Sequence, residues 1–228
     1  MNDFERRHVV VTGGSGALGT AVCAELIGRG AHVHVPVFAP RELDRFPYRN
    51  HEQASVRAGL DLTVEATVER YYAELPSLWA SIHLAGGFAG SSVVDTSLEG
   101  FLELMNRNAV TTFLACREAV KTMRRTGGGG RIVNVASTSA LSPSAGTVPY
   151  SSSKAVVVAL TRGLADEVLG EGILVNAVAP TMIDTPANRA AMPNADRAGW
   201  SAPAGIAIEV AHLASPRNSV TRGAILPV

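Results

Sequence analysis

The feature that most constrains this chain is an alternation of short apolar runs with segments of helical length. The apolar runs are typical of strands that are buried on both faces of a sheet. They span residues 8–12, 32–37, 55–60, 81–85, 131–136, 174–179 and 223–228. The segments between them include residues 18–29, 63–75, 98–125 and 150–169, whose length and pattern are those of helices.

A β-α order that repeats in this way predicts a parallel sheet with helices on both faces and right-handed connections. We therefore expect an α/β fold with a doubly wound parallel sheet of about seven strands. No linker and no repeat divides the chain, so residues 1–228 are expected to form one domain. One long stretch, 181–205, has an irregular pattern and is a candidate substrate lid.

The charge of the chain excludes some partners. Twenty basic and twenty acidic residues give a formal net charge of zero, which offers no basic field for nucleic acid or anionic lipid. The first residues lack the apolar stretch of a signal peptide, and no apolar run approaches the roughly 20 residues of a membrane span. The two cysteines, Cys23 and Cys116, lie among apolar residues in helical segments, so we expect reduced thiols and a cytoplasmic protein.

A glycine-rich turn connects the first expected strand to the first expected helix. It reads Thr-Gly-Gly-Ser-Gly-Ala-Leu-Gly over residues 12–19. Glycines there leave the backbone amides open, and a helix N-terminus stabilises a phosphate without any lysine. The alternative is a tight turn that binds no ligand.

Tyr150 and Lys154 are four residues apart in an expected helix. This spacing places both side chains on one helix face, where the ammonium favours the phenolate and lowers the pKa of the phenol. Such a phenol is suited to general acid-base chemistry. The alternative is a surface pair with no chemical role.

Together these motifs resemble the short-chain dehydrogenase/reductase family, whose patterns are Thr-Gly-x-x-x-Gly-x-Gly and Tyr-x-x-x-Lys. Ala17 replaces the middle glycine of the first pattern, with Gly16 one place earlier. The resemblance implies a Rossmann-like fold and hydride transfer between a nicotinamide cofactor and a small carbonyl or alcohol substrate. It assigns no metal ligands.

The resemblance also implies a catalytic set of Asn108, Ser137, Tyr150 and Lys154. Ser137 lies thirteen residues before the tyrosine, at the end of an expected strand, and would hold the substrate oxygen. Asn108 matches the asparagine that interrupts a helix and holds a water in the proton relay. Ser139 is a weaker alternative for the serine, and each of these residues taken singly could be a cap or turn residue.

Further similarities extend the expected cofactor site. Asp61-Leu62-Thr63 resembles the segment that contacts adenine, although Asp61 could instead be a helix N-cap. Before Ala85, His83 and Leu84 replace two asparagines of the family, so we expect polar contacts that brace the sheet to be missing and His83 to be structural. The residues assigned to the cofactor are Gly13, Ser15, Gly16, Ala17, Leu18, Asp61, Leu62, Ala85, Gly86, Gly87, Tyr150, Lys154, Pro180, Ile183 and Thr185.

The end of the second expected strand bears on the choice of cofactor. NAD-preferring members carry an acidic residue there, and this chain has Val37. The absence of that carboxylate favours NADP(H) over NAD(H), with Arg41 as a possible clamp for the 2′-phosphate.

The substrate is less constrained. The expected pocket residues are Phe88, Leu141, Ser144, Met182, Met192 and Trp200. The segment after Pro180 resembles the lid of dihydropteridine reductases, which leaves pterin reduction as an alternative. That subgroup lacks the serine and asparagine found here, which favours carbonyl or alcohol chemistry. A nucleotide-sensing protein without catalysis is an alternative of another class.

Two expected helices carry more apolar surface than one sheet face can cover. They span residues 109–123 and 155–168, and the second includes Val156, Val157, Val158 and Leu160. Similar helices form subunit interfaces in the family, so a homodimer or homotetramer is expected.

Overall fold

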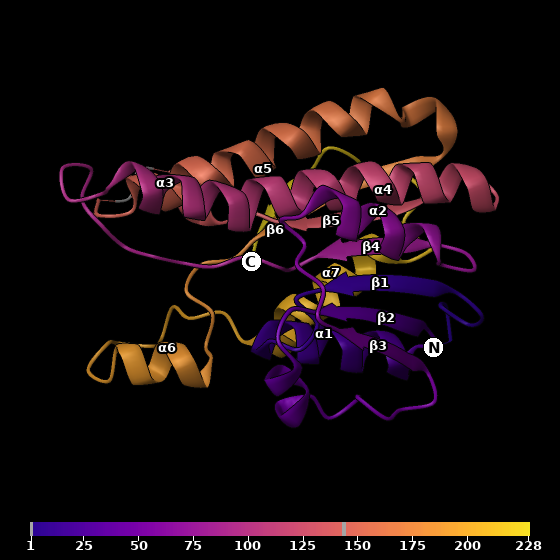
Figure 1. The fold of residues 1–228 in the computed structure, drawn as a ribbon, viewed down its shortest axis with the longest axis horizontal. Coiled ribbons are helices and arrows are strands. Elements are labelled where there is room, and N and C mark those ends of the chain that lie inside the picture. Colours follow the sequence, from indigo (N-terminus) through magenta and orange to yellow (C-terminus); the bar gives the residue numbers. More distant parts are fainter. Residues whose placement is uncertain (1, 143–144) are drawn as a thin grey trace.

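The computed structural model describes residues 2–142 and 145–228, and within them seven strands form one parallel sheet (Figure 1). The strand order is β3-β2-β1-β4-β5-β6-β7, as expected for a doubly wound sheet. Each strand lies within two residues of its predicted bounds. The strands are β1 His8–Thr12, β2 His32–Val37, β3 Ala54–Ala58, β4 Ala80–His83, β5 Gly130–Val135, β6 Ile173–Ala179 and β7 Ile225–Pro227.

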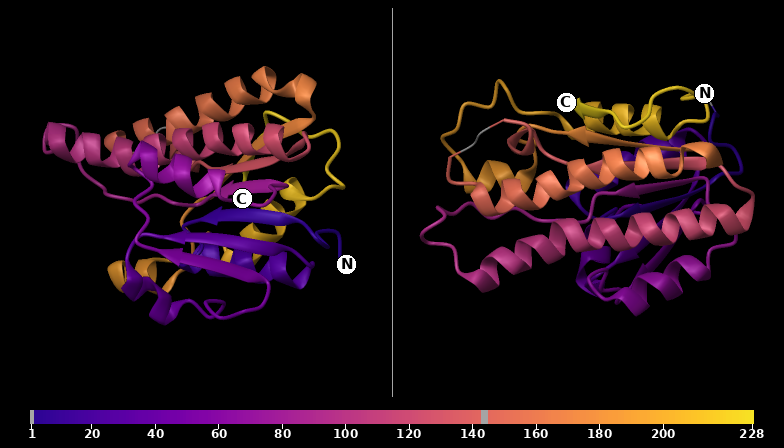
Figure 2. Two further views of the ribbon diagram at one scale, coloured as in Figure 1. Left: turned by 45° about the vertical axis from the view of Figure 1, so that its right-hand side comes forward. Right: turned by 90° about the horizontal axis from the view of Figure 1, so that it is seen from above.

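Helices cover both faces of the sheet. On one face lie α1 (Ala17–Gly28) and α7 (Pro203–Ala214), and on the other α2 (Glu65–Ala73), α4 (Thr111–Thr126) and α5 (Val148–Glu167) (Figures 1 and 2). Alternate side chains of each inner strand enter the two core layers. In the part of the chain that is described, no helix has both the length and the apolar character needed to cross a membrane.

The two edge strands are less buried than the sequence predicted, because every strand was expected to be buried on both faces. In β3, Ser55 and Arg57 are exposed, and β7 is only partly buried. The reason is their position, because the helices pack over the inner strands and leave the sheet edges uncovered.

The long helix predicted over residues 98–125 is interrupted at Asn108, as the family resemblance implied. α3 (Leu98–Met105) leads into the π-turn η2 (Asn106–Val110) and then into α4. The Thr111 amide donates to the Asn106 carbonyl five residues earlier, which defines the π-turn. Three short 3₁₀ segments, η1 (Pro40–Arg45), η3 (Thr138–Ala140) and η4 (Leu169–Glu171), complete the connections.

The candidate lid contains regular structure, which corrects the prediction of an irregular stretch. A short helix, α6, spans Pro186–Ala191, and α7 already begins at Pro203. Thr185 starts α6, because its hydroxyl accepts from the Asn188 amide at 3.1 Å and Pro186 follows at the first helical position. The lid closes on itself through a parallel bridge between Ile183 and Ser201.

The expected loss of polar contacts around His83 is also wrong. The two ring nitrogens of His83 lie 2.8 Å from Ser81 Oγ and 2.8 Å from Asn134 Oδ1, the latter on β5. Ser81 in turn bonds Tyr72, and Asn134 donates to Thr161 on α5. Burial lowers the pKa of His83 to about 4, so the ring is neutral and structural, as predicted.

Both cysteines match their prediction. Cys23 and Cys116 are unpaired and buried, and burial raises the pKa of each thiol to about 12. Both pack in the core as small side chains, and the Cys116 thiol also donates to Asn134 Oδ1 at 3.5 Å.

The first turn of α1 gives a test of the packing. A Cβ on Gly19 would overlap the Gly13 carbonyl and lie 2.5 Å from the Gly14 Cα. We expect Gly19→Ala to lower the free energy of unfolding by about 1–3 kcal/mol, measured by urea denaturation. Gly28→Ala, in the same helix, is the control, because a Cβ there meets nothing within 4 Å and should raise stability by about 0.5–1 kcal/mol. Equal urea midpoints for Gly19→Ala and Gly28→Ala would contradict the close packing of Gly19 against Gly13 and Gly14.

Candidate active site

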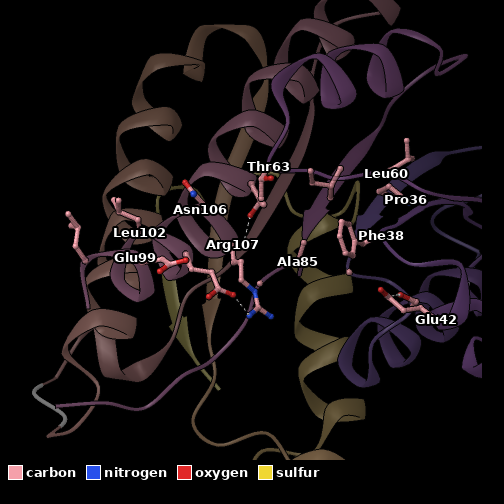
Figure 3. Close-up of a pocket in the computed structure, with 17 residues that line it drawn as sticks. Pro36, Phe38, Glu42, Leu60, Thr63, Ala85, Glu99, Leu102, Asn106 and Arg107 are labelled. Carbon is pink, nitrogen blue, oxygen red and sulfur yellow. Dashed lines mark hydrogen bonds and ion pairs between the residues drawn. The ribbon is translucent and has the colours of Figure 1, made fainter. Parts of the chain in front are cut away.

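A cavity of about 910 Å³ opens at the carboxyl ends of β1, β2 and β4 (Figure 3). Ligands of open parallel sheets bind at this edge, where the strand order reverses between β1 and β4. Five of the predicted cofactor residues line it: Gly13, Ser15, Leu62, Ala85 and Gly86. The other lining residues are Pro36, Phe38, Glu42, Leu60, Thr63, Leu98, Glu99, Leu102, Glu103, Asn106, Arg107 and Thr111.

The glycine loop fits the phosphates of a dinucleotide. Gly13 has φ +67°, and a Cβ there would lie 2.8 Å from the Ala85 amide nitrogen, so the loop touches the segment after β4. Gly16 is the N-cap of α1, and no side chain caps that end. A Cβ on Gly16 would meet only the Gly13 carbonyl, at 3.3 Å. The first-turn amides of α1 are therefore open to an anion, and Ala17 and the partly buried Leu18 begin that turn.

Glu42 is a cavity residue that the sequence analysis missed. Its carboxylate accepts from Ser15 Oγ at 2.7 Å and from the Ala39 amide at 3.2 Å. A usable signal existed in the sequence, because a Pro at the first turn followed by Glu two residues later marks a capped helix start. Arg41, the suggested clamp, is not among the residues that line the cavity.

Tyr150, Ser137 and Ser139 lie together, although none of the three lines the cavity. Tyr150 is hydrogen-bonded to Ser137, whose Oγ lies 3.0 Å from Ser139 Oγ. The Ser139 amide also donates to Ser137 Oγ at 3.3 Å, so Ser137 caps η3. The ring of Phe88, a predicted pocket residue, meets the Tyr150 ring edge-on with centroids 4.9 Å apart.

The predicted effect of Lys154 on the phenol is wrong in this structure. Burial raises the pKa of Tyr150, although the hydrogen bond with Ser137 lowers it. The Lys154 ammonium instead donates to the Val135 carbonyl at 2.8 Å. Burial lowers the pKa of Lys154 to about 8, so the lysine is still charged at pH 7 and the tyrosine is a neutral phenol.

Asn108 is fully buried and fixes the segment after β4. Its Oδ1 accepts from the Gly87 amide at 2.9 Å, and its Nδ2 donates to the Gly87 carbonyl and to Ser153 Oγ, each at 3.0 Å. A Cβ on Gly86 would lie 2.5 Å from Asn108 Oδ1 and 3.6 Å from Lys154 Nζ. The structure thus brings Asn108 and Lys154 together at Gly86. The role of Asn108 in a proton relay stays a prediction.

Asp61 is not the N-cap of α2, which corrects that alternative. Its Oδ1 accepts from the Thr63 amide at 2.9 Å and from the Thr63 hydroxyl at 2.7 Å, forming a turn before the helix. The N-cap of α2 is Val64. Asp61 therefore shapes the loop that places Leu62 in the cavity wall.

The remaining predicted residues follow β6. The Pro180 carbonyl accepts from the Thr138 amide at 3.1 Å, which ties the start of the lid to η3. Ile183 packs against the core and Thr185 caps α6. Met182, Met192 and Trp200 are partly buried, Leu141 is exposed, and Ser144 lies outside the described residues. None of the predicted pocket residues within the described ranges lines the cavity itself.

The chain is similar to known dehydrogenases and reductases over most of its length. It matches the short chain dehydrogenase family over residues 7–196. It is 31% identical to the 3-beta-hydroxysteroid dehydrogenase of Comamonas testosteroni, over 99% of this chain and 95% of that protein. It is 28% identical to the 3-oxoacyl-acyl-carrier-protein reductase of Rickettsia bellii (strain RML369-C), over 100% and 97%. The solved structure of ElxO with NADP bound has a TM-score of 0.88 at 25% identity, over 97% and 96% of the chains.

The buried lysine predicts a pH-dependent stability. Its folded-state pKa of about 8 lies below the ordinary 10.5, so between these values the unfolded state binds more protons and stability rises with pH. We expect Lys154→Met to unfold at a higher temperature than the natural chain at pH 7, by an equivalent of about 1–3 kcal/mol. This advantage should shrink as the pH rises from 8 to 10.5.

Lys121→Met is the matched control, because the Lys121 side chain is 54% exposed. Thermal melts of both variants at several pH values check the prediction. An advantage of Lys154→Met that is the same at pH 7 and pH 10 would contradict it.

Proposed function

Because the chain belongs to the short-chain dehydrogenase/reductase family, we propose that it is an NADP(H)-dependent oxidoreductase acting on a small carbonyl or alcohol substrate. One observation carries this proposal most directly. Tyr150 is hydrogen-bonded to Ser137, and on the same helix Lys154 reaches Gly86 at the rim of the cavity. Tyr150 supplies a proton donor, Ser137 a hydroxyl that can bind the substrate oxygen, and Lys154 a cation at the rim of a cavity large enough for a dinucleotide.

The chain's own residues would hold the cofactor in a definite way. The glycine loop and the open amides of α1 bind the pyrophosphate, and Leu60, Leu62 and Phe38 offer apolar walls for the adenine. Lys154 binds the ribose next to the nicotinamide. The bound nicotinamide supplies or accepts the hydride.

Two observations support NADP(H). Val37 leaves the end of β2 without the carboxylate that would repel a 2′-phosphate, and ElxO has been solved with NADP. Glu42 is the nearby charge that opposes this preference, although Ser15 and the Ala39 amide already engage its oxygens. The preference is therefore expected to be modest.

The pKa values fit catalysis in the direction of reduction. The raised pKa of Tyr150 keeps it a phenol, the form that donates a proton to the substrate oxygen as hydride reaches the carbonyl carbon. Ser137 donates a hydrogen bond to that oxygen. Lys154 is charged at pH 7, but it binds the ribose in this proposal and does not set the pKa of Tyr150.

The substrate is a ketone or aldehyde with an apolar body. Phe88 lies against Tyr150, and the lid carries three further apolar side chains that are partly buried, Met182, Met192 and Trp200. The two relatives are named for a 3-oxoacyl group and for a 3-beta-hydroxysteroid. The proximity of Ser137 to Tyr150 favours this chemistry over pterin reduction.

We also propose that the chain forms a homodimer or homotetramer through α4 and α5, which lie side by side as an outer layer (Figure 2). Phe113 on α4 is 48% exposed and Val156 on α5 is 40% exposed. Val157 and Val158, also expected at the interface, are buried within the chain. The exposed pair are apolar groups that a second copy can cover.

The oligomer can be tested by charge insertion. We expect Val156→Glu to shift the sedimenting species towards monomer, because a carboxylate would be buried without a partner in the interface. Val220→Glu is the control, since Val220 is 81% exposed in the loop before β7 and should leave the assembly unchanged. A natural chain that sediments as a monomer would contradict the proposal.

The catalytic assignment is tested by Tyr150→Phe. We expect turnover to fall at least about 100-fold through loss of the proton donor, while the dissociation constant for NADPH stays within about twofold. Tyr48→Phe is the control, since Tyr48 packs against Phe46 and His51 away from this site. Turnover is measured with NADPH and with NADH on ketones, aldehydes, 3-oxoacyl thioesters and quinonoid dihydropterin.

The outcomes separate the alternatives. Unchanged turnover in Tyr150→Phe would overturn the assignment of the proton donor. Activity of the natural chain confined to the pterin would replace carbonyl chemistry with pterin reduction. Tight dinucleotide binding without hydride transfer to any of these substrates would favour a nucleotide sensor.

A further inference from the structure

The charges around the cavity are unusual for a site that would bind a diphosphate. Three carboxylates line it, from Glu42, Glu99 and Glu103. Among the described residues that line the cavity, Arg107 is the one basic side chain. Carboxylates repel an anionic ligand. The negative charge of its phosphates must therefore be balanced by the open amides of α1 and by a nearby cationic side chain.

Arg107 lies against the segment that borders the glycine loop. A Cβ on Gly87 would be 2.6 Å from Arg107 Nη2 and 2.7 Å from Cζ, so the guanidinium packs directly over that glycine. Two residues earlier, Ala85 touches Gly13 of the loop. Figure 3 shows the Arg107 side chain extending into the cavity from η2, towards Ala85.

Arg107 already forms an ion pair with Glu103, but that pair is weak enough for a phosphate to replace the carboxylate. Its Nη1 lies 3.3 Å from Glu103 Oε1, and the two side chains are 50% and 65% exposed. Exposed pairs of this kind contribute about 0–1 kcal/mol. In the described part of the chain, Nη2 has no hydrogen-bond partner, and it lies on the Gly87 side of the guanidinium.

The π-turn explains how Arg107 reaches this position. η2 carries Arg107 and Asn108 in sequence, and Asn108 is fully buried against Gly87 while Arg107 passes over the outer side of the same glycine. The extra residue of a π-turn changes the direction of neighbouring side chains relative to a regular helix. Two adjacent residues therefore clamp one backbone segment from two sides.

From these contacts we infer that Arg107 is a cofactor-binding residue whose guanidinium pairs with the pyrophosphate of the dinucleotide. The inference rests on the proposed function. The 2′-phosphate of NADP(H) would lie at the end of β2, near Val37, whereas Arg107 packs on Gly87 in the segment after β4, which contacts the glycine loop through Ala85. A planar guanidinium suits a diphosphate because it can donate two parallel hydrogen bonds.

The test measures binding rather than activity. Dissociation constants of NADPH, NADH, 5′-ADP and adenosine 2′-monophosphate are determined by fluorescence and calorimetric titration at low and high salt. The variants are Arg107→Gln, Arg107→Lys and, as matched control, Glu103→Gln, which keeps the arginine and removes its partner. Thermal melts confirm that each variant is folded.

We expect Arg107→Gln to weaken NADPH, NADH and 5′-ADP alike, by roughly 10- to 100-fold at low salt and less at high salt. Adenosine 2′-monophosphate, which has no 5′-phosphate, should bind unchanged. Arg107→Lys should be intermediate, because it keeps the charge without the planar fork. Glu103→Gln should bind at least as tightly as the natural chain.

Two results would overturn the inference alone. One is unchanged binding of all four ligands by Arg107→Gln when the natural chain binds NADPH. The other is a loss confined to NADPH and adenosine 2′-monophosphate, which would place the arginine at the 2′-phosphate. A natural chain that binds neither NADPH nor NADH would overturn the proposed function as well.

Discussion

The site depends on one close approach, between the glycine loop after β1 and the segment after β4. Gly13 has no room for a side chain against Ala85, and Gly86 has none against Asn108 Oδ1, with Lys154 Nζ at contact distance. Parallel strands that are neighbours in the sheet deliver these two segments to the same edge, and the absence of side chains lets them touch. Because Asn108 and Lys154 then meet at Gly86, the helices that carry them are held in register with the loop.

Burying the polar groups around this contact costs desolvation free energy, and a network of hydrogen bonds offsets that cost. His83, Ser81, Tyr72 and Asn134 satisfy one another between β4, β5 and α2, so a polar chain crosses the core without an isolated charge. Lys154 is different, because burial lowers its pKa and, among residues 2–142 and 145–228, the Val135 carbonyl is its one hydrogen-bond acceptor. A charge kept inside the fold at the expense of stability is typical of a functional group.

Sequence reasoning succeeded where the information is local or follows strand order. The β-α alternation predicted the sheet, and the i, i+4 spacing placed Tyr150 and Lys154 on one helix. It failed where a side chain meets a distant element. His83 could replace the asparagines of the family only because Asn134 and Ser81 lie beside it, and nothing near His83 in the chain shows Asn134.

The same limit applies to the missed cavity residues and to the phenol. Glu42 and Arg107 reach the cavity from η1 and η2, and their directions depend on short irregular turns. The pKa of Tyr150 was expected to fall because of Lys154, but burial of the phenol dominates and the ammonium is held by a β5 carbonyl. The sign of such a shift depends on burial and distance together, which spacing along a helix does not provide.

The distribution of polarity around the cavity also gives a ligand a direction. Pro36, Phe38, Leu60 and Leu62 form an apolar side, whereas the glycine loop and Arg107 supply donors at the centre. A dinucleotide has a fixed order of base, phosphates and second base, so an adenine on the apolar side and phosphates on the donors leave one direction for the nicotinamide. That direction leads past Gly86 to Lys154 and Tyr150. Binding of the adenine end would therefore be enough to bring the nicotinamide to the proposed proton donor, Tyr150, without separate recognition of the nicotinamide ring.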